Sequence, residues 1–426
     1  MQQTPIANRL HISLFGKTNV GKSTIINSIT NQQVSVVSDF RGTTTDPVYK
    51  TMELPPIGPV VFADTAGIDD DSEIGELRIK KTVDVLNKTD IVVMVFSAEE
   101  FYPVDNMDEF LKLPILEEMF AKEITWFNEA KKLNKTIVGA FNKCDLFRGL
   151  NSEKEEEFYI DKALNMLKQI FPIDFVVLYK EKKFINRLKD CIIKNAPVTS
   201  IDKPLVGDKV KAGDKVILVT PQDLEAPKGR LILPQVQVLR DLLDHKAMPL
   251  MTSLENLNEA LSVFNNKPDL VITDSQVFKE VEETIPKDIA LTSFSILMAR
   301  FKGELELLYQ GAKKIKLLKE GDKVLIAEAC THHNLKGDIA RDKLPKWLSD
   351  FCPGIIVENY SGHDFPDNLE QYELVIHCGS CMLNRAEFMT RVNHCKGKNL
   401  AITNFGMTIA ELNGILDRAT EILLKK

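Results

Sequence analysis

The sequence predicts an α/β protein of three domains, and three observations lead to this fold class. Short apolar segments alternate with amphipathic segments along the chain, which is the pattern of parallel strands joined by helices. The 426 residues suffice for about three domains at roughly 150 residues each. Residues 195–213 have the proline and glycine content of a linker. We therefore expect domains at residues 1–197, 198–294 and 295–426.

In each domain, the expected strands are short apolar runs and the expected helices are amphipathic. In the first domain, strands are predicted at 11–15, 60–63, 91–96, 136–141 and 174–177, and helices at 21–30 and 117–133. In the second, strands are predicted at 215–220, 249–251, 270–273 and 289–292, and helices at 235–244, 254–265 and 275–284. In the third, a long helix over 296–319 precedes strands at 323–327, 354–358, 374–377 and 399–403. No internal repeat is evident.

The composition excludes several classes of protein. Hydrophobic residues make up 44% and charged residues 27% of the chain, which excludes a largely disordered or fibrous protein. The net charge of −7 argues against a dedicated nucleic-acid binder, which usually carries a basic excess. No apolar run approaches the roughly 18 residues that a membrane helix needs, and the N-terminus lacks the pattern of a signal peptide. We expect a cytoplasmic protein with neither nucleic acid nor membrane as a partner.

A phosphate-binding loop is predicted between the first strand and the first helix. Residues 16–23 fit the pattern G-x-x-x-x-G-K-[ST]. The glycines let backbone N–H groups close around a β-phosphate, and the helix that follows adds the positive end of its dipole. Lys22 is expected to bridge β- and γ-phosphates and Ser23 to bind Mg²⁺. The nucleotide-binding residues expected here are Gly16, Thr18, Asn19, Val20, Gly21, Lys22, Ser23 and Thr24.

Two further motifs follow expected strands and complete a guanine-nucleotide site. Asp64 can reach the Mg²⁺ shell, and the N–H of Gly67 can bind the γ-phosphate. Asn142, Lys143 and Asp145 belong to the motif Asn-Lys-x-Asp. The Asp145 carboxylate can accept hydrogen bonds from both N1–H and the exocyclic amine of guanine. Adenine does not offer this pair of donors, so the motif selects GTP.

The polar segment 42–46 lies between the phosphate loop and Asp64. A threonine in this segment can close on Mg²⁺ when the γ-phosphate is present, which makes the segment a switch. We favour Thr44 as this ligand, with Thr43 as the alternative. Lys22, Thr44 and Gly67 are therefore the residues expected to act in hydrolysis.

The order of these motifs resembles the translation-factor-type GTPases, and among them the TrmE/Era-like branch. Ile68 stands where Ras-like enzymes have a water-orienting glutamine, and this branch also has an apolar residue there. Asn19 matches the asparagine that holds K⁺ in the K⁺-stimulated members, so the resemblance implies K⁺. We expect slow hydrolysis, because neither a catalytic glutamine nor an arginine finger is evident. The segment Leu178-Tyr179-Lys180 departs from the family's Ser-Ala-Lys, which puts its contact to guanine in doubt.

Five of the seven cysteines lie in the last quarter of the chain, and three of them form a candidate metal site. Cys330 and His332 follow one expected strand, and His377, Cys378 and Cys381 follow another. Since ligands bind outside the carboxyl ends of strands in open α/β sheets, the two groups would meet at one edge. Tetrahedral zinc suits mixed cysteine and histidine ligands, whereas an iron–sulfur cluster suits three cysteines. The spacing does not decide between them.

The pattern C-x-H…H-C-x-x-C, formed by Cys330, His332, His377, Cys378 and Cys381, resembles the HydF family of [FeFe]-hydrogenase maturation factors. That family joins a GTPase domain, a dimerisation domain and a Rossmann-like α/β iron–sulfur domain, so the resemblance covers essentially the whole chain. It implies GTP or GDP with Mg²⁺, and a homodimer. It also implies a [4Fe-4S] cluster on the three cysteines, with a fourth site open to His332 or His377. The resemblance further implies a scaffold that receives a diiron precursor from HydE and HydG and delivers it to apo-hydrogenase HydA.

Two other readings remain open at this point. The first domain alone would suit an RNA-modification or ribosome-associated GTPase with a zinc-binding module. A metalloenzyme that turns over a small molecule would need an acid or base near the cluster, for which Glu328 and Asp338 are the candidates. The second domain carries no evident site, which favours a role in self-association.

Overall fold

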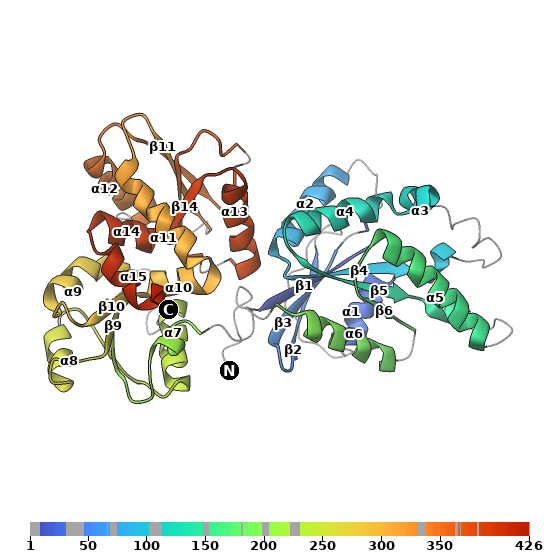
Figure 1. Cartoon of the computed structure of the whole chain (residues 1–426), viewed down its shortest axis with the longest axis horizontal. Helices are drawn as coiled ribbons and strands as arrows, with labels where there is room; N and C mark the ends of the chain where they lie inside the picture. The colour runs from blue at the N-terminus through green and yellow to red at the C-terminus, as the bar shows by residue number, and fades with distance from the viewer. Residues whose placement is uncertain are drawn as a thin grey trace. The chain divides into compact units, whose positions relative to one another are not determined.

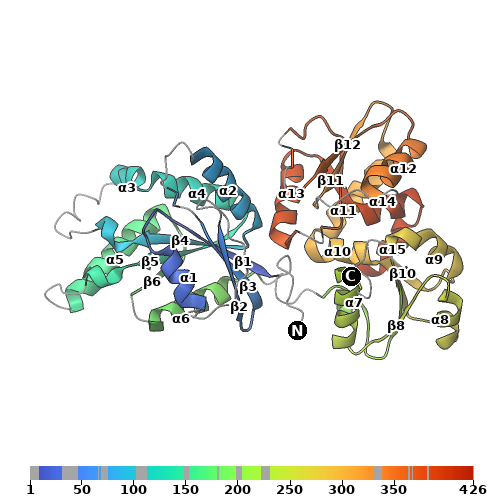
Figure 2. The same cartoon turned by 180° about the vertical axis from the view of Figure 1, so that it is seen from behind.

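The computed structural model describes residues 9–30, 47–65, 67–68, 75–101, 113–147, 153–179, 182–197, 204–221, 231–329, 338–362, 365–366, 368–380 and 383–425. The chain divides into two compact units, Met1–Asp202 and Lys203–Lys426. Figures 1 and 2 show the helices and strands of each unit from opposite sides. The boundaries expected for three domains stay a prediction, but the α/β fold class is confirmed.

The N-terminal unit is built on a six-stranded sheet in the order β2-β3-β1-β4-β5-β6, in which β2 alone runs antiparallel to its neighbour. Its strands are β1 (Leu10–Phe15), β2 (Val48–Leu54), β3 (Gly58–Asp64), β4 (Ile91–Ser97), β5 (Thr136–Asn142) and β6 (Phe175–Val177). Its described helices are α1 (Lys22–Thr30), α2 (Gly75–Lys88), α3 (Leu113–Met119), α4 (Ala121–Lys132), α5 (Glu153–Ile170) and α6 (Lys182–Asn195). Each predicted strand is present, and β2 is additional.

Helices cover both faces of this sheet, and alternate strand residues enter two separate cores. In β4, Val93 and Val95 pack with α1 and α6, whereas Met94 and Phe96 pack with α4 and α5. The helix predicted over 117–133 is instead two helices that meet at Phe120. Phe120 is fully buried and contacts the rings of Phe96, Phe101 and Phe171. The chain therefore turns where this ring enters the core.

The C-terminal unit contains two four-stranded parallel sheets. The first has the order β10-β9-β7-β8 and comprises β7 (Lys215–Val219), β8 (Met248–Thr252), β9 (Leu270–Thr273) and β10 (Ala290–Ser293). The second has the order β12-β11-β13-β14 and comprises β11 (Lys323–Glu328), β12 (Ile356–Ser361), β13 (Leu374–His377) and β14 (Ala401–Asn404). The described helices are α7 (Leu233–Asp244), α8 (Leu257–Val263), α9 (Phe278–Thr284), α10 (Phe294–Lys302), α11 (Leu305–Lys313), α12 (Leu344–Phe351), α13 (Arg385–Gly397), α14 (Phe405–Leu412) and α15 (Leu416–Leu424). One continuous apolar core joins the two sheets.

The two sheets of this unit repeat one another, which corrects the expectation of no internal repeat. In each sheet, the first strand of the sequence lies inside the sheet and the second strand pairs on one side of it. The third and fourth strands follow on the other side. Gly213 and Gly321 precede the first strand of each sheet and share a φ of 88°. Asp214 and Asp322 follow them, and each carboxylate accepts a hydrogen bond from the backbone N–H three residues earlier, at 2.7 and 2.8 Å. Leu-Val-Ile opens both β9 and β13. The signal in the sequence is limited to the Gly-Asp pair before the first strand and three apolar residues in the third strand of each sheet.

The prediction of one long helix over 296–319 is wrong, because the first helix ends at Lys302 and a second helix follows. The helix α10 ends there, and α11 begins at Leu305. Gly303 lies at the break, where an added Cβ would come within 2.9 Å of the Phe388 ring. In α11, a Cβ at Gly311 would meet the carbonyl oxygen of Ile402 at 1.9 Å. The break thus packs closely against α13, and α11 packs closely against β14.

None of the helices in the described part of the chain is long and apolar enough to cross a membrane.

Candidate functional site

The phosphate loop lies between β1 and α1, at the strand where the order of the first sheet reverses (Figure 1). Ligands bind at such points in open α/β sheets. Two positions of the loop require glycine, because atoms of neighbouring strands approach them closely. A Cβ on Gly16 would meet the Val95 carbonyl oxygen at 2.4 Å, and one on Gly21, which has a φ of 99°, would meet Asn142 Nδ2 at 2.4 Å. The loop is therefore held tightly against the ends of β4 and β5.

The ammonium group of Lys22 lies across this loop. Its Nζ donates hydrogen bonds to the carbonyl oxygens of Gly16, at 2.9 Å, and Lys17, at 2.8 Å. The side chain is buried. These carbonyl groups hold the charge over the place where the loop would close on phosphate oxygens, as the sequence predicts for this lysine.

Ser23 and Asp64, which the sequence predicts as Mg²⁺ ligands, meet beside the loop. Ser23 Oγ donates a short hydrogen bond to Asp64 Oδ2. Asp64 Oδ1 is buried and has no hydrogen-bond partner among the described residues. An unpartnered carboxylate oxygen beside a serine hydroxyl suits Mg²⁺, which prefers oxygen ligands. Thr44 and Thr43 lie outside the described residues.

The segment that follows Asp64 also returns to the phosphate loop. The Ile68 N–H donates to the Gly16 carbonyl oxygen at 3.3 Å, and Thr65 Oγ1 donates to the Leu14 carbonyl oxygen at 2.6 Å. Gly67 lies between these two anchors. The structure thus brings the backbone of the predicted γ-phosphate contact close to the loop.

The predicted guanine motif is tied directly to the phosphate loop. Asn142 Nδ2 donates to the Val20 carbonyl oxygen at 2.8 Å, which joins the end of β5 to the loop. Lys143 has a φ of 61°, and its Nζ pairs with Glu99 Oε2 at 2.5 Å. The hydrogen bond from Lys143 holds the pKa of Glu99 below its usual range. Asp145 follows in a short 3-10 helix, Cys144–Phe147.

The departing segment after β6 still reaches this motif. The Cys144 N–H donates to the Leu178 carbonyl oxygen at 3.2 Å, and the Leu178 N–H donates to the Phe141 carbonyl oxygen at 2.7 Å. Tyr179 follows, and Lys180 lies outside the described residues. Burial raises the pKa of the Cys144 thiol, so this cysteine is a core residue and not a reactive group.

The remaining predicted residues of the loop differ in conformation and exposure. Asn19 has a φ of 63°, a left-handed conformation that asparagine tolerates better than most residues. Val20 is buried, whereas Thr18 and Thr24 are exposed. The role of Asn19 toward K⁺ stays a prediction.

A charged cluster around Lys17 was not predicted. Lys17 Nζ lies 2.6 Å from Glu100 Oε1 and 3.3 Å from Glu123 Oε1, and it donates to the Met119 carbonyl oxygen at 3.0 Å. It also lies 5.0 Å from the centroid of the Phe120 ring. These contacts anchor the phosphate loop to the segment after β4 and to α3 and α4. The partners of Lys17 are more than 80 residues away along the chain, and no local sequence pattern predicts these contacts.

The candidate cysteine site lies at the carboxyl ends of β11 and β13, which are neighbours in the second sheet of the C-terminal unit. The sequence predicted that its two groups of residues would meet at one edge. The Ala329 N–H donates to Cys378 Sγ at 3.1 Å. Cys378 is 9% exposed and packs with Ala329, Leu383 and Phe405. A backbone N–H donor suits a sulfur that ligates a cluster, because such a donor holds the ligand in place and tunes the bound metal.

Other residues of the site lie outside the described part of the chain. Cys330, which follows Ala329 directly, His332 and Cys381 are among them. No group of three or more histidine, cysteine, aspartate or glutamate residues suited to a metal occurs within the described residues. Cys378 and His377 are therefore the two members of the predicted ligand set whose surroundings are known.

His377 is fully buried, and both of its ring nitrogens are engaged. Arg391 Nη1 donates to Nε2 at 3.0 Å, so the proton lies on Nδ1, which is 3.0 Å from the Cys378 carbonyl oxygen and 3.1 Å from Ser380 Oγ. Burial and the nearby Arg391 charge lower the pKa of His377 to about 3. A metal that used His377 would first have to displace one of these partners.

The two acidic candidates for a turnover enzyme serve structural roles. Glu328 is buried and accepts hydrogen bonds from Arg341 Nε, at 3.1 Å, and Ser361 Oγ, at 3.2 Å. Asp338 accepts from the backbone N–H groups of Ala340 and Arg341, at 2.7 and 3.1 Å. These two residues flank the chain segment that carries Cys330, and their carboxylates are engaged in the hydrogen bonds given above.

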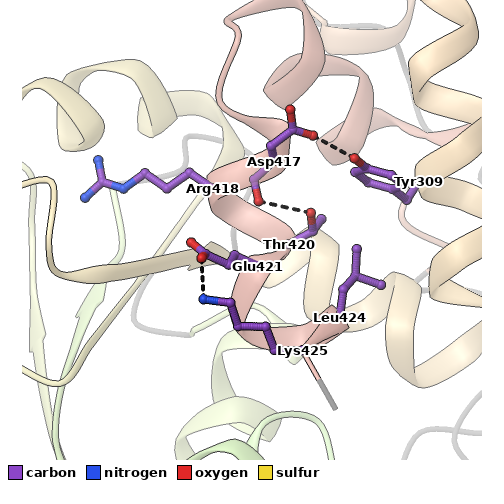
Figure 3. Close-up of a pocket in the computed structure, with 7 residues that line it drawn as sticks. All are labelled: Tyr309, Asp417, Arg418, Thr420, Glu421, Leu424 and Lys425. Carbon is purple, nitrogen blue, oxygen red and sulfur yellow. Dashed lines mark hydrogen bonds and ion pairs between the residues drawn. The ribbon is translucent and has the colours of Figure 1, made fainter.

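A hollow beside α15 contains none of the predicted site residues (Figure 3). It is lined by Tyr309, Asp417, Arg418, Thr420, Glu421, Leu424 and Lys425. Its polar groups pair with one another, as Tyr309 Oη does with Asp417 at 2.7 Å and Lys425 does with Glu421. We assign no ligand to it.

Three family models match the chain. That of the 50S ribosome-binding GTPase matches residues 11–129. That of the hydrogen maturase F dimerization domain matches residues 205–303, and that of the hydrogen maturase F tetramerization domain matches residues 306–422. The last two together cover nearly all of the C-terminal unit and support self-association.

Curated relatives match only part of the chain. The tRNA modification GTPase MnmE of Bacteroides thetaiotaomicron is 28% identical over 200 residues, which are 46% of this chain and 38% of that protein. The GTPase Der of Kosmotoga olearia is 30% identical over 165 residues, which are 36% of this chain and 33% of that protein. The chain thus spans well under half of the length of these relatives. Among solved structures, Aquifex aeolicus Era bound to GDP·AlF4⁻ is 20% identical, with 60% of this chain and 97% of that chain covered and a TM-score of 0.31.

Proposed function

Because the chain belongs to the hydrogen maturase F family, we propose that it is a GTP-hydrolysing scaffold that carries a [4Fe-4S] cluster. In this role it assembles and delivers the diiron precursor of the [FeFe]-hydrogenase active site. The observation that carries the proposal is the meeting of Ala329 and Cys378 at the ends of two adjacent strands. This places the chain that leads into Cys330 beside the sulfur of Cys378, in a protein that also has a phosphate loop.

The N-terminal unit supplies the nucleotide chemistry. The backbone of the loop would bind the β-phosphate, and Lys22 would leave its two carbonyl partners for phosphate oxygens. Ser23 and Asp64 would bind Mg²⁺, and Asp145 would select guanine. Hydrolysis is expected to be slow and to be stimulated by K⁺ held beside Asn19. Equal hydrolysis rates in K⁺ and Na⁺ would remove the K⁺ part of this proposal.

The C-terminal unit would hold the cluster through Cys330, Cys378 and Cys381. Three thiolates leave one iron with an exchangeable site, which is the chemistry that a cluster supplies for holding a further metal group. Either His332 or His377 is the candidate for the fourth ligand, and His377 would have to give up its hydrogen bond with Arg391. The proposed partners are HydE and HydG, as sources of the precursor, and HydA, as its recipient, with a homodimer as the assembly.

The second candidate function is an RNA-modification or ribosome-associated GTPase with a zinc module. The matches of the N-terminal unit to a tRNA modification GTPase favour it. The net charge of −7 and the matches of the C-terminal unit count against it.

The deciding experiment is metal and sulfide analysis of protein purified without oxygen. Wild type is compared with the double variant Cys378→Ala/Cys381→Ala and with Cys352→Ala, whose cysteine lies in the same unit and bonds the Leu318 carbonyl oxygen. We expect about four iron atoms and four sulfides per chain in wild type and Cys352→Ala, and almost none in the double variant. Stoichiometric zinc without iron would overturn the proposal and favour the second candidate.

A further inference from the structure

A buried lysine from a different part of the C-terminal unit contacts the segment that carries Cys378 and Cys381, which we call the cysteine turn. Lys302 is the last residue of α10, and its side chain is 2% exposed. It belongs to the segment matched by the dimerization domain, whereas Cys378 belongs to the segment matched by the tetramerization domain. The helices α10 and α13 lie side by side, and α13 follows the cysteine turn (Figures 1 and 2).

The ammonium group of Lys302 holds both described flanks of Cys381. Its Nζ donates to the carbonyl oxygens of Ser380, at 2.6 Å, and Leu383, at 2.9 Å. Ser380 has a φ of 56°, a left-handed conformation that is costly for a serine and persists only when its surroundings impose it. The lysine therefore holds a strained backbone at the point from which Cys381 is reached.

The same group brings a positive charge into a dry region. Its Nζ donates to two neutral carbonyl groups, and a second cation, Arg391, which interacts electrostatically with Glu387, is mostly buried against His377 and the Gly362 carbonyl oxygen. A cluster held by three thiolates carries net negative charge, and it becomes more negative on reduction. Buried cations close to such a cluster stabilise it, and they stabilise its reduced form most.

We propose that Lys302 is a positioning residue for the cluster: it fixes the turn between Cys378 and Cys381 and supplies a buried positive charge that favours cluster retention and reduction. This inference rests on the proposed function, because it assumes a cluster on these cysteines. It also links the dimerization segment to the cysteine site through one side chain at the end of α10.

The anchoring role can be tested without a cluster, by hydrogen exchange in iron-free protein. The variant Lys302→Met removes the charge and the donors at similar volume. The control is Lys313→Met, because Lys313 lies at the end of α11 and pairs with Glu411 and Asp417 instead of the turn. In Lys302→Met we expect the amides of residues 378–386 to exchange about 10-fold faster, as loss of a charged hydrogen bond implies. Unchanged exchange in this segment would overturn the anchoring role.

The electrostatic role needs protein reconstituted with iron and sulfide. In Lys302→Met, we expect a chelator to remove iron about 10- to 100-fold faster, as for other residues that support metal ligands, and the reduction potential to fall. Lys302→Gln keeps a donor without the charge, so it should restore part of the retention while its potential stays low. Wild-type potentials in both variants would overturn the electrostatic role.

Two checks keep the outcomes distinct. The GTP hydrolysis rate and the circular dichroism of each variant confirm that the chain is folded. A wild-type protein that takes up no iron–sulfur cluster would defeat the proposed function, and the exchange experiment would still decide whether Lys302 holds the turn. A loaded wild type with unaltered Lys302 variants would defeat this inference alone.

Discussion

The backbone N–H of Ala329 donates a hydrogen bond of 3.1 Å to the sulfur of Cys378. This contact joins the ends of β11 and β13, and Cys330 is the next residue in the chain. Two segments that are almost 50 residues apart are thereby brought to one point of the sheet. The contact therefore fixes the position of the Cys378 sulfur beside the residue that leads into Cys330.

Arg391 is expected to be a major source of stability beneath this site. It donates to His377 Nε2 and to the Gly362 carbonyl oxygen, and it lies 5.3 Å from the Phe365 ring. Arg391→Met should lower the free energy of unfolding of the C-terminal unit by about 2–4 kcal/mol, because two buried acceptors lose a charged donor. Lys396→Met, on the exposed face of the same helix, should change it by less than about 0.5 kcal/mol.

The unfolding can be followed in one unit alone. The chain has two tryptophans, Trp126 in the N-terminal unit and Trp347 in the C-terminal unit. In a Trp126→Phe background, urea titration of tryptophan fluorescence reports only on the C-terminal unit. An Arg391→Met midpoint equal to that of Lys396→Met would show that the buried guanidinium is not a stabilising group.

The contact between Asn142 and Val20 is expected to control nucleotide affinity. Asn142→Ala leaves a loop carbonyl group without its donor and frees the loop from β5. We expect GDP to bind about 10-fold more weakly, which corresponds to the loss of one well-placed hydrogen bond. Titration with a fluorescent GDP analogue measures this. Asn195→Ala, which removes a hydrogen bond within α6, is the control and should bind GDP like wild type.

Asp145 is expected to decide the choice of base. Asp145→Asn replaces an acceptor by a donor, so guanine should be rejected by at least about 100-fold. Xanthine offers an acceptor in place of the exocyclic amine, so xanthosine triphosphate should be accepted instead. Competition between GTP and xanthosine triphosphate measures this change in base preference. Retained preference for GTP in this variant would mean that another group reads the base.

The ion pair of Asp208 and Arg300 predicts a loss of stability in acid. Burial raises the pKa of Asp208, but the hydrogen bonds and charge of Arg300 outweigh it and leave the pKa below its usual value. A lowered carboxyl pKa contributes stability at neutral pH, and this contribution is lost as the pH falls through that pKa. Asp208→Asn should therefore cost about 1 kcal/mol at pH 7, the upper range for a partly exposed pair, and less near pH 2. The urea midpoint of the C-terminal unit at both pH values provides the measurement, and an equal cost at both would contradict it.

The features that could be predicted from the sequence are those that depend on residues close together in the chain. The phosphate loop, the Asn-Lys-x-Asp motif and the strand ends that carry Cys378 each depend on neighbouring residues, and the structure places them as expected. The break at Gly303 was missed because the apolar periodicity continues across it, and the close packing of Gly303 against the distant Phe388 ring leaves no local signal. The antiparallel β2 was missed because its residues are mostly half-buried and alternate weakly.

The supporting charges could not have been found from the sequence. Lys302 bonds backbone carbonyl groups about 80 residues away, and any residue type supplies such a group. Lys17 meets Glu100 and Glu123 only because β1 pairs with β4, after which Glu100 follows, and α4 packs on β4 and β5. These residues look like ordinary solvated charges until the fold places them.

The most direct test of the proposed function is the activation of iron-deficient [FeFe]-hydrogenase by purified protein, in the presence of HydE and HydG. Wild type is compared with Cys378→Ala/Cys381→Ala, after both have been shown to hydrolyse GTP at the same rate. We expect hydrogen production with wild type and almost none with the double variant, because the diiron precursor would have no cluster on which to be held. Equal activation by the two proteins would contradict the cysteine site as the scaffold.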